Sequence, residues 1–283
     1  MCDVSTEFCK KRYGASYELL DSCRQRFLPF MMQGDWGGYS VRKEHEEQAT
    51  ELYNTWLSHS DLWVKPFDTI PLVKDMRYKN QVNLKINAAK ACLDDVISVI
   101  KDLASYTELW NDAFFKRDAV DIVRTACGRF LNFLIASSLY DEDTSSVIEK
   151  KTVYMNLHNA LKKLLSANDD FSLYSTLEYL RKVAPVNPDF EKTFKQNIGN
   201  EYCRQYCYEL MDSLFGKEAE LLFDWLADGR NEEAVSALKQ EKVRIFDSFI
   251  STPLSELKPE KPCNASEISL EIVDILRQLG EIL

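Results

Sequence analysis

Apolar residues recur at helical spacing through most of the chain. Clear stripes over Val82 to Leu103, Asp112 to Leu139 and Val147 to Leu165 predict three long helices. Further helical stripes lie at 16–28, 41–57, 171–183, 188–215, 218–227, 232–250 and 267–283. No alternating apolar and polar stretch runs beyond four residues, which argues against strands. The pattern predicts an all-α protein, a multi-helix bundle of about ten helices.

Two segments interrupt this pattern. Residues 62–80 contain Pro66 and Pro71 and read as a long irregular connection. Residues 251–264 contain three prolines and read as a linker. We therefore expect a helical domain over 1–250, a Pro-rich linker over 251–265 and a C-terminal amphipathic helix over 266–283. Gly199 falls inside the predicted helix 188–215 and marks a weak point in it.

Composition narrows the possible partners. The 283 residues are 45% hydrophobic and 28% charged, with only 9 Gly and 8 Pro, as in an ordinary globular domain. The formal net charge is −10 and no basic patch stands out, which argues against nucleic-acid partners. The first residues lack the apolar stretch of a signal peptide, and no apolar run approaches the ~18 residues of a membrane span. We expect no membrane segment, and a cytoplasmic location if the chain is complete.

Cysteine and histidine usage predicts no metal site and no cofactor. The eight cysteines are scattered, mostly at apolar helical positions, and fit buried thiols in a reducing compartment. A few disulfides in a secreted protein are the alternative. Cys203 and Cys207 lie one turn apart, but no second pair completes the four ligands of a structural zinc. None of the three histidines forms a ligand pair at helical spacing.

The stretch FFKRDAVDIVRTACGRFLNFL, residues 114–134, is the most crowded in the chain. Four charged residues interleave with apolar ones within eight positions: Arg117, Asp118, Asp121 and Arg124. On a helix, Asp121 can pair with Arg124, or Arg117 with Asp121. One interpretation is that these charges form an ion-pair seam, which fixes how the helix packs against its neighbours. The other is that one of the charged side chains points into a substrate cleft. The chemistry alone favours the seam.

A second candidate is the glycine-rich loop QGDWGGY at 33–39. It lacks the Gly-Lys-Ser/Thr ending of a phosphate-binding loop and follows no strand. Its Trp36 and Tyr39 suit stacking on a sugar ring or contact with a neighbouring domain, and the plainer interpretation is a turn anchored by two aromatic rings.

The order of segments resembles a known family. DVSTEFCKKRYGASYELLDSCRQRFLPF, residues 3–30, is similar to the helix–turn–helix that opens the C-terminal helical domain of α-N-acetylglucosaminidases. In that family a helix ends in Arg-Tyr-Gly, here Arg12, Tyr13 and Gly14. About a hundred residues later, FKRDAVDIVR resembles the family's FRYDLVDLTRQ helix, with Arg117 in place of its tyrosine. Residues 170–181 and 195–199 resemble two further segments of that family more weakly.

The resemblance covers roughly residues 3–250 and has one clear departure. After Asn197, the family carries a Trp-Gly loop and an Asp-Tyr-Ala-Asn-Lys run, and this chain has EYCRQYCYEL instead. Contacts made by those family segments are therefore not carried over.

The resemblance implies a helical partner of a catalytic barrel. In that family the catalytic acids lie on a (β/α)₈ barrel that precedes the helical domain. A barrel needs eight strands, and the pattern of this chain predicts none. The implied function is an accessory helical domain that supports or shapes a sugar-binding cleft. The implied partners are a catalytic barrel and a carbohydrate, and the domain has no catalytic residue of its own. The candidate residues for sugar binding or domain docking are Trp36, Tyr39, Trp63, Arg117, Asp118, Asp121, Arg124 and Asn197.

Two other functions stay open. A helical protein–protein interaction module without enzymatic activity fits the many helices and the acidic composition. A stand-alone enzyme with carboxylates inside the bundle fits less well, because the Glu-x-x-His pairs of di-iron bundles are missing from the sequence.

Overall fold

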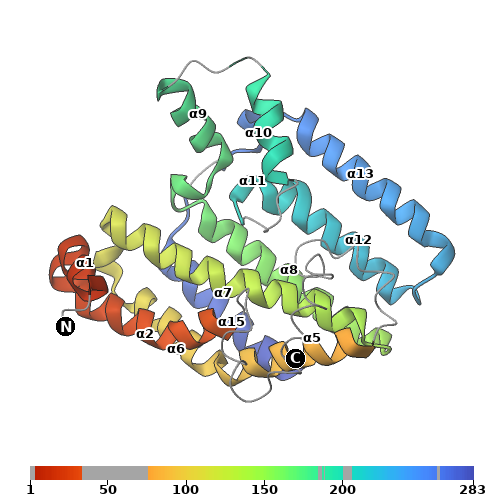
Figure 1. Ribbon diagram of the computed structural model, residues 1–283, viewed down its shortest axis with the longest axis horizontal. Coiled ribbons are helices and arrows are strands. Elements are labelled where there is room, and N and C mark those ends of the chain that lie inside the picture. Colours follow the sequence, from red (N-terminus) through yellow and green to blue (C-terminus); the bar gives the residue numbers. More distant parts are fainter. Residues whose placement is uncertain (1–3, 34–75, 184–186, 188, 200–205, 260–261) are drawn as a thin grey trace.

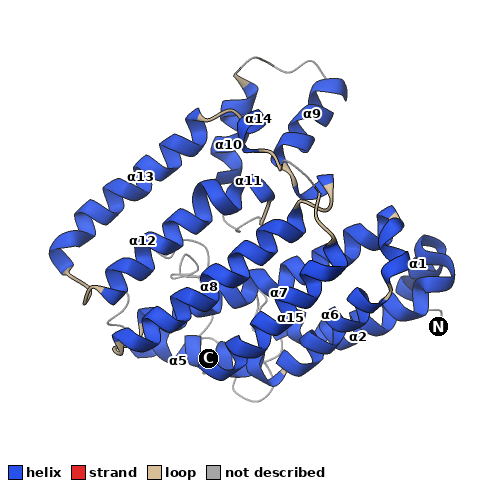
Figure 2. Cartoon of the chain, turned by 180° about the vertical axis from the view of Figure 1, so that it is seen from behind, coloured by secondary structure: helices blue, strands red, loops and turns tan. Residues whose placement is uncertain are grey.

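The computed structural model describes residues 4–33, 76–183, 187, 189–199, 206–259 and 262–283 (Figure 1). This part of the chain is helical and contains no strand (Figure 2), which confirms the all-α class. Its helices are α1 Val4–Tyr13, α2 Tyr17–Gln33, α5 Met76–Ala91, α6 Leu93–Ser105, α7 Ala113–Leu139, α8 Thr144–Leu165, α9 Leu173–Val183, α10 Phe190–Gly199, α11 Tyr208–Leu210, α12 Gly216–Ala227, α13 Val235–Ser251, α14 Leu254–Leu257 and α15 Ala265–Ile282. No described helix is long and apolar enough to cross a membrane.

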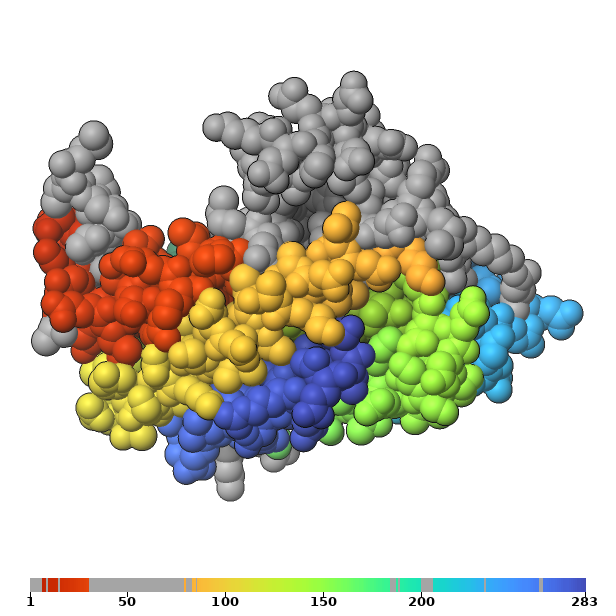
Figure 3. All heavy atoms as spheres, turned by 90° about the horizontal axis from the view of Figure 1, so that it is seen from below, coloured from red at the N-terminus to blue at the C-terminus, as the bar shows by residue number. Residues whose placement is uncertain are grey.

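The centre of the core lies around α8, which packs against both α7 and α15. Helix α7 packs along α8, and α15 packs against both α6 and α8. Figure 3 shows α15, in blue, between α6 in yellow and α8 in green. Phe130 of α7, Leu161 of α8 and Leu276 of α15 have no exposed surface. Burying a large apolar side chain contributes about 1.5–3 kcal/mol, so this layer supplies much of the stability.

The predicted helix boundaries hold best where polar residues cap a helix. Asp112 accepts a hydrogen bond from the Phe115 N–H at 2.8 Å and starts α7, as the pattern over 112–139 predicts. Asp143 accepts from the Ser145 N–H and starts α8, which begins three residues before the predicted Val147. Helices α1 and α2, joined by one turn at 14–16, form the expected helix–turn–helix.

Three predicted segments were wrong in detail. The helix expected over 82–103 is two helices that break at Cys92, and α5 already begins at Met76, inside the segment expected to be irregular. The helix expected over 188–215 ends at Gly199, where an added Cβ would lie 2.7 Å from the Phe246 ring. Because Gly199 has no side chain, α13 can pack closely against this end of α10. Helix propensity describes single helices and does not predict such a contact between two helices.

The C-terminal part of the chain is built into the bundle. Residues expected to be a linker include α14, whose Leu254 is fully buried. Helix α15 lies in the core, because its apolar stripe covers α6 and α8. Leu276 and Leu279 of that stripe have no exposed surface.

Side chains from distant helices satisfy several helix ends. The carboxylate of Glu209, a residue of α11, lies against the first turn of α9. It accepts hydrogen bonds from the N–H groups of Leu173 and Tyr174 at 2.8 and 3.0 Å. At the end of α6, Ser266 donates to the carbonyl oxygen of Ala104 at 2.7 Å. Terminal N–H and C=O groups have no partner inside their own helix, so these bonds fix how neighbouring helices meet.

Candidate functional site

The end of α1 meets the first turns of α7 at a single carboxylate. Arg12 Nε donates to Asp118 Oδ2 at 2.9 Å and Arg12 Nη2 donates to Asp118 Oδ1 at 3.2 Å, a two-point contact. The Tyr13 hydroxyl also donates to Asp118 Oδ2. Residues 106 positions apart in the sequence are thus joined by charge-assisted hydrogen bonds.

Arg117 extends this network to a third segment. Its Nη1 donates to Asp118 Oδ1 at 2.9 Å, and its Nε donates to Asp170 Oδ2 at 2.7 Å. Asp170 lies in the short turn 169–171 between α8 and α9. We call Arg12, Tyr13, Arg117, Asp118 and Asp170 the Asp118 cluster.

The Asp118 cluster has a shielded half and an open half. The side chains of Arg12 and Asp118 are 21% and 20% exposed, whereas those of Arg117 and Asp170 are 46% and 56% exposed. The shielded pair holds α1 against α7. The open pair leaves a guanidinium and a carboxylate facing solvent, where both can bond to a polar ligand.

Two exposed aromatic rings lie beside the cluster. The guanidinium carbon of Arg12 lies 4.5 Å from the ring centroid of Phe114 and 5.8 Å from that of Phe8. Both phenylalanines are more than half exposed. Aromatic faces next to fixed polar groups are typical of sites that orient a small ligand with one apolar and one polar side.

The remaining predicted charges of α7 pair locally. Arg124 Nε donates to Asp121 Oδ1 at 3.0 Å, and its guanidinium carbon lies 5.1 Å from the ring centroid of Phe171. The pairing of Asp121 with Arg124 is confirmed. Arg117 pairs with Asp118 and Asp170, so its alternative pairing with Asp121 was wrong. The sequence predicted one seam on this helix, and the structure divides its charges between a local pair and the Asp118 cluster.

The other sequence candidates lie elsewhere. Asn197 is exposed on α10, outside the cluster. Trp36, Tyr39 and Trp63 lie outside the described residues. Among the described residues, four of the five sequence candidates therefore lie on α7, and Asn197 lies on α10.

Three members of the cluster were not among the predicted site residues: Arg12, Tyr13 and Asp170. In the sequence, the only signal at these positions was the resemblance of their segments to the family described above. The pairing itself depends on tertiary contacts, so no spacing rule within one helix could reveal it.

Other buried polar groups have structural partners. His158 Nε2 lies 2.8 Å from the carbonyl oxygen of Met211, in the π-helical turn that precedes α12, and burial lowers the pKa of His158. Lys150 Nζ donates to Asp141 Oδ2 at 2.6 Å. This hydrogen bond helps to lower the pKa of Asp141, although burial opposes the shift. Within the described residues no group of three or more His, Cys, Asp or Glu could hold a metal ion.

Comparison of the chain with protein-family models, with curated proteins and with solved structures finds no match. The chemistry of the Asp118 cluster and the resemblance of its segments are therefore the grounds for a functional proposal.

Proposed function

We propose that this chain is an accessory helical domain of an α-N-acetylglucosaminidase-like glycoside hydrolase, and that the Asp118 cluster faces the carbohydrate beside a catalytic barrel. One observation carries the proposal. Three segments that resemble that family, far apart in the sequence, supply the members of one hydrogen-bonded cluster through Arg12, Asp118 and Asp170. A resemblance due to chance gives no reason for its segments to meet in space.

The geometry of the cluster suits a supporting role in sugar binding. Arg117 and Asp170 offer donors and acceptors for hydroxyl and acetamido groups, and Phe8 and Phe114 offer exposed ring faces. Each carboxylate of the cluster is paired with an arginine, which suits binding and positioning of a ligand.

A thermal-shift experiment with N-acetylglucosamine tests this proposal. The sugar at millimolar concentration should raise the melting temperature of the chain, and glucose at equal concentration should raise it less. Arg117→Ala should abolish the shift. Arg181→Ala is the matched control, because Arg181 is 44% exposed and also bridges two carboxylates, those of Glu178 and Glu191, away from the cluster.

The same samples should not hydrolyse a chromogenic α-N-acetylglucosaminide. Turnover by pure protein would overturn the accessory role, because the catalytic acids would then lie in these helices. Absence of any sugar-induced shift would overturn the carbohydrate-facing role and favour a helical protein–protein interaction module.

A further inference from the structure

The C-terminal end of α13 is capped by a lysine of α10. Lys195 is 2% exposed, and its Nζ donates to the carbonyl oxygens of Phe249 at 3.0 Å and Thr252 at 2.7 Å. The residue four positions after Phe249 is Pro253, which has no N–H to donate to that carbonyl. A charged lysine therefore satisfies this helix end and complements its dipole.

One N–H of this ammonium group has no acceptor among the described residues. A charged lysine carries three N–H donors, and the two carbonyl oxygens use two of them. Glu191 is the carboxylate that acts on Lys195 electrostatically, but its oxygens accept from the Leu254 N–H at 2.7 Å and from Arg181 at 3.2 Å. A buried donor without an acceptor is unfavourable, so the third N–H marks a place for an oxygen atom.

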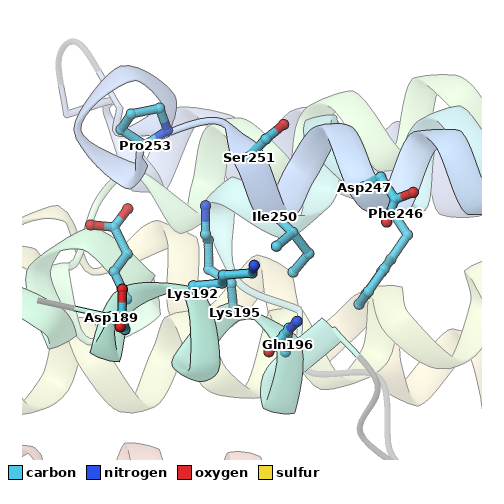
Figure 4. Close-up of a pocket in the computed structure, with 10 residues that line it drawn as sticks. Asp189, Lys192, Lys195, Gln196, Phe246, Asp247, Ile250, Ser251 and Pro253 are labelled. Atoms are coloured by element: carbon cyan, nitrogen blue, oxygen red, sulfur yellow. The ribbon is translucent and has the colours of Figure 1, made fainter. Parts of the chain in front are cut away.

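Lys195 lies in the wall of a pocket of about 580 Å³ between α10 and α13. Figure 4 shows the lining residues on the two helices, with Lys192 and Gln196 from α10 and Phe246 and Ile250 from α13. Phe246 and Ile250 are only partly buried, so the pocket has an apolar wall as well as a charged one. A space of this size accommodates a small organic molecule.

The lining carries charges of both signs. Lys192 and Lys195 are joined there by Asp189, Asp247 and Glu191. The last of these is neutralised by an arginine from outside the lining. The two aspartates and Lys192 form no ion pair within the described part of the chain. Two ammonium groups and two carboxylates therefore remain for a ligand, a balance that suits a zwitterion better than a simple anion.

We infer that this pocket binds a small α-amino acid with an apolar side chain. The carboxylate of the ligand accepts the third N–H of Lys195 and lies beside the Lys192 ammonium group, in a charge-assisted contact. The ammonium group of the ligand lies toward Asp247, and its side chain packs on Phe246 and Ile250 of the same helix. A ligand with only one charge satisfies only one side of this lining.

Leucine and two analogues that each lack one charge test this inference on the intact chain. 4-Methylpentanoate lacks the amino group and isopentylamine lacks the carboxylate, and both keep the branched apolar end. An NMR titration of the isotope-labelled chain at pH 7 should give saturable changes with leucine at the amides of residues 189–196 and 246–252. Each analogue should bind at least about tenfold more weakly, because each loses one charge-assisted contact.

Three outcomes of this titration would overturn the inference. They are an absence of saturable changes with leucine, changes centred on another part of the chain, and equal affinity for leucine and either analogue. The comparison uses the unaltered chain, so it does not depend on whether a variant folds.

Substitutions of exposed residues give a second readout, and Lys195 is left in place because it also holds α13. Asp247→Asn should weaken leucine binding and leave 4-methylpentanoate binding unchanged, because only leucine carries the ammonium group. Lys192→Gln should weaken the binding of both ligands. Lys239→Gln is its matched control, because Lys239 is exposed on α13 outside the pocket lining.

An equal effect of Asp247→Asn on both ligands, or equal effects of Lys192→Gln and Lys239→Gln, would also overturn the inference. The residues concerned lie on α10 and α13, outside the Asp118 cluster. The result is therefore independent of sugar binding at that cluster.

Discussion

Replacing Asp118 by alanine should release α1 from α7. Asp118 accepts four hydrogen bonds from three residues, Arg12, Tyr13 and Arg117, and two of those donors carry a full charge. A hydrogen bond to a charged group contributes about 1.5–3 kcal/mol, and bonds to one shared acceptor do not add. We expect a loss of about 2 kcal/mol for the contact between the two helices.

The loss should be local, because α1 lies at the edge of the bundle and the core is formed by other helices (Figure 1). A loss of about 2 kcal/mol raises the opening equilibrium of α1 by about 30-fold. Hydrogen–deuterium exchange of the amides of residues 4–13 measures this directly. Exchange of α7, α8 and α15 should change little.

Asp170→Asn is the matched control for this prediction. It removes only the outer ion pair with Arg117, whose side chains are 46% and 56% exposed, and such pairs contribute about 1 kcal/mol or less. Exchange of α1 should stay close to that of the wild type. Unchanged protection of α1 in Asp118→Ala, or equal loss in both variants, would refute the reasoning that the shielded half of the cluster holds α1.

Three further predictions concern the core. Gly128→Ala places a Cβ 2.5 Å from the buried Tyr206 ring and should cost about 1–3 kcal/mol in a urea titration; a change under about 0.5 kcal/mol would contradict this packing. Burial lowers the pKa of His158 in the folded chain, so His158 binds a proton more readily in the unfolded chain. The free energy of unfolding should therefore fall as the pH drops below about 6.5, by up to about 1.4 kcal/mol per pH unit. His158→Gln should remove this dependence of stability on pH. In a brief iodoacetamide pulse on native protein, partly exposed Cys263 should react well before fully buried Cys127, and equal rates would contradict the burial.

The sequence predicted the helices whose signals are local. Helices α7 and α8 each have an amphipathic stripe along their own sequence. Each is also preceded by a capping aspartate, Asp112 for α7 and Asp143 for α8. Helix ends that depend on packing were predicted less well: Gly199 was noted as a weak point, but the helix was carried past it, and the helix at 254–257 was not expected. Gly199 ends α10 where α13 comes close, and residues 254–257 form a helix because Leu254 enters the core.

In the candidate site, too, the residues marked by a local sequence signal were predicted, and those that depend on tertiary contacts were not. Arg117 and Asp118 were identified because charged residues crowd one helix, a property that the sequence displays. Arg12 and Asp170 reach them only through the tertiary fold.

An NMR titration of the isotope-labelled chain with N-acetylglucosamine tests the central claim most directly. The account predicts saturable changes that are largest at the amides of residues 8–14 and 114–118 and in the turn 169–171, with little change elsewhere. Glucose should produce weaker changes at the same amides. An absence of saturable changes, or changes centred on another part of the chain, would contradict a carbohydrate-facing role for the Asp118 cluster.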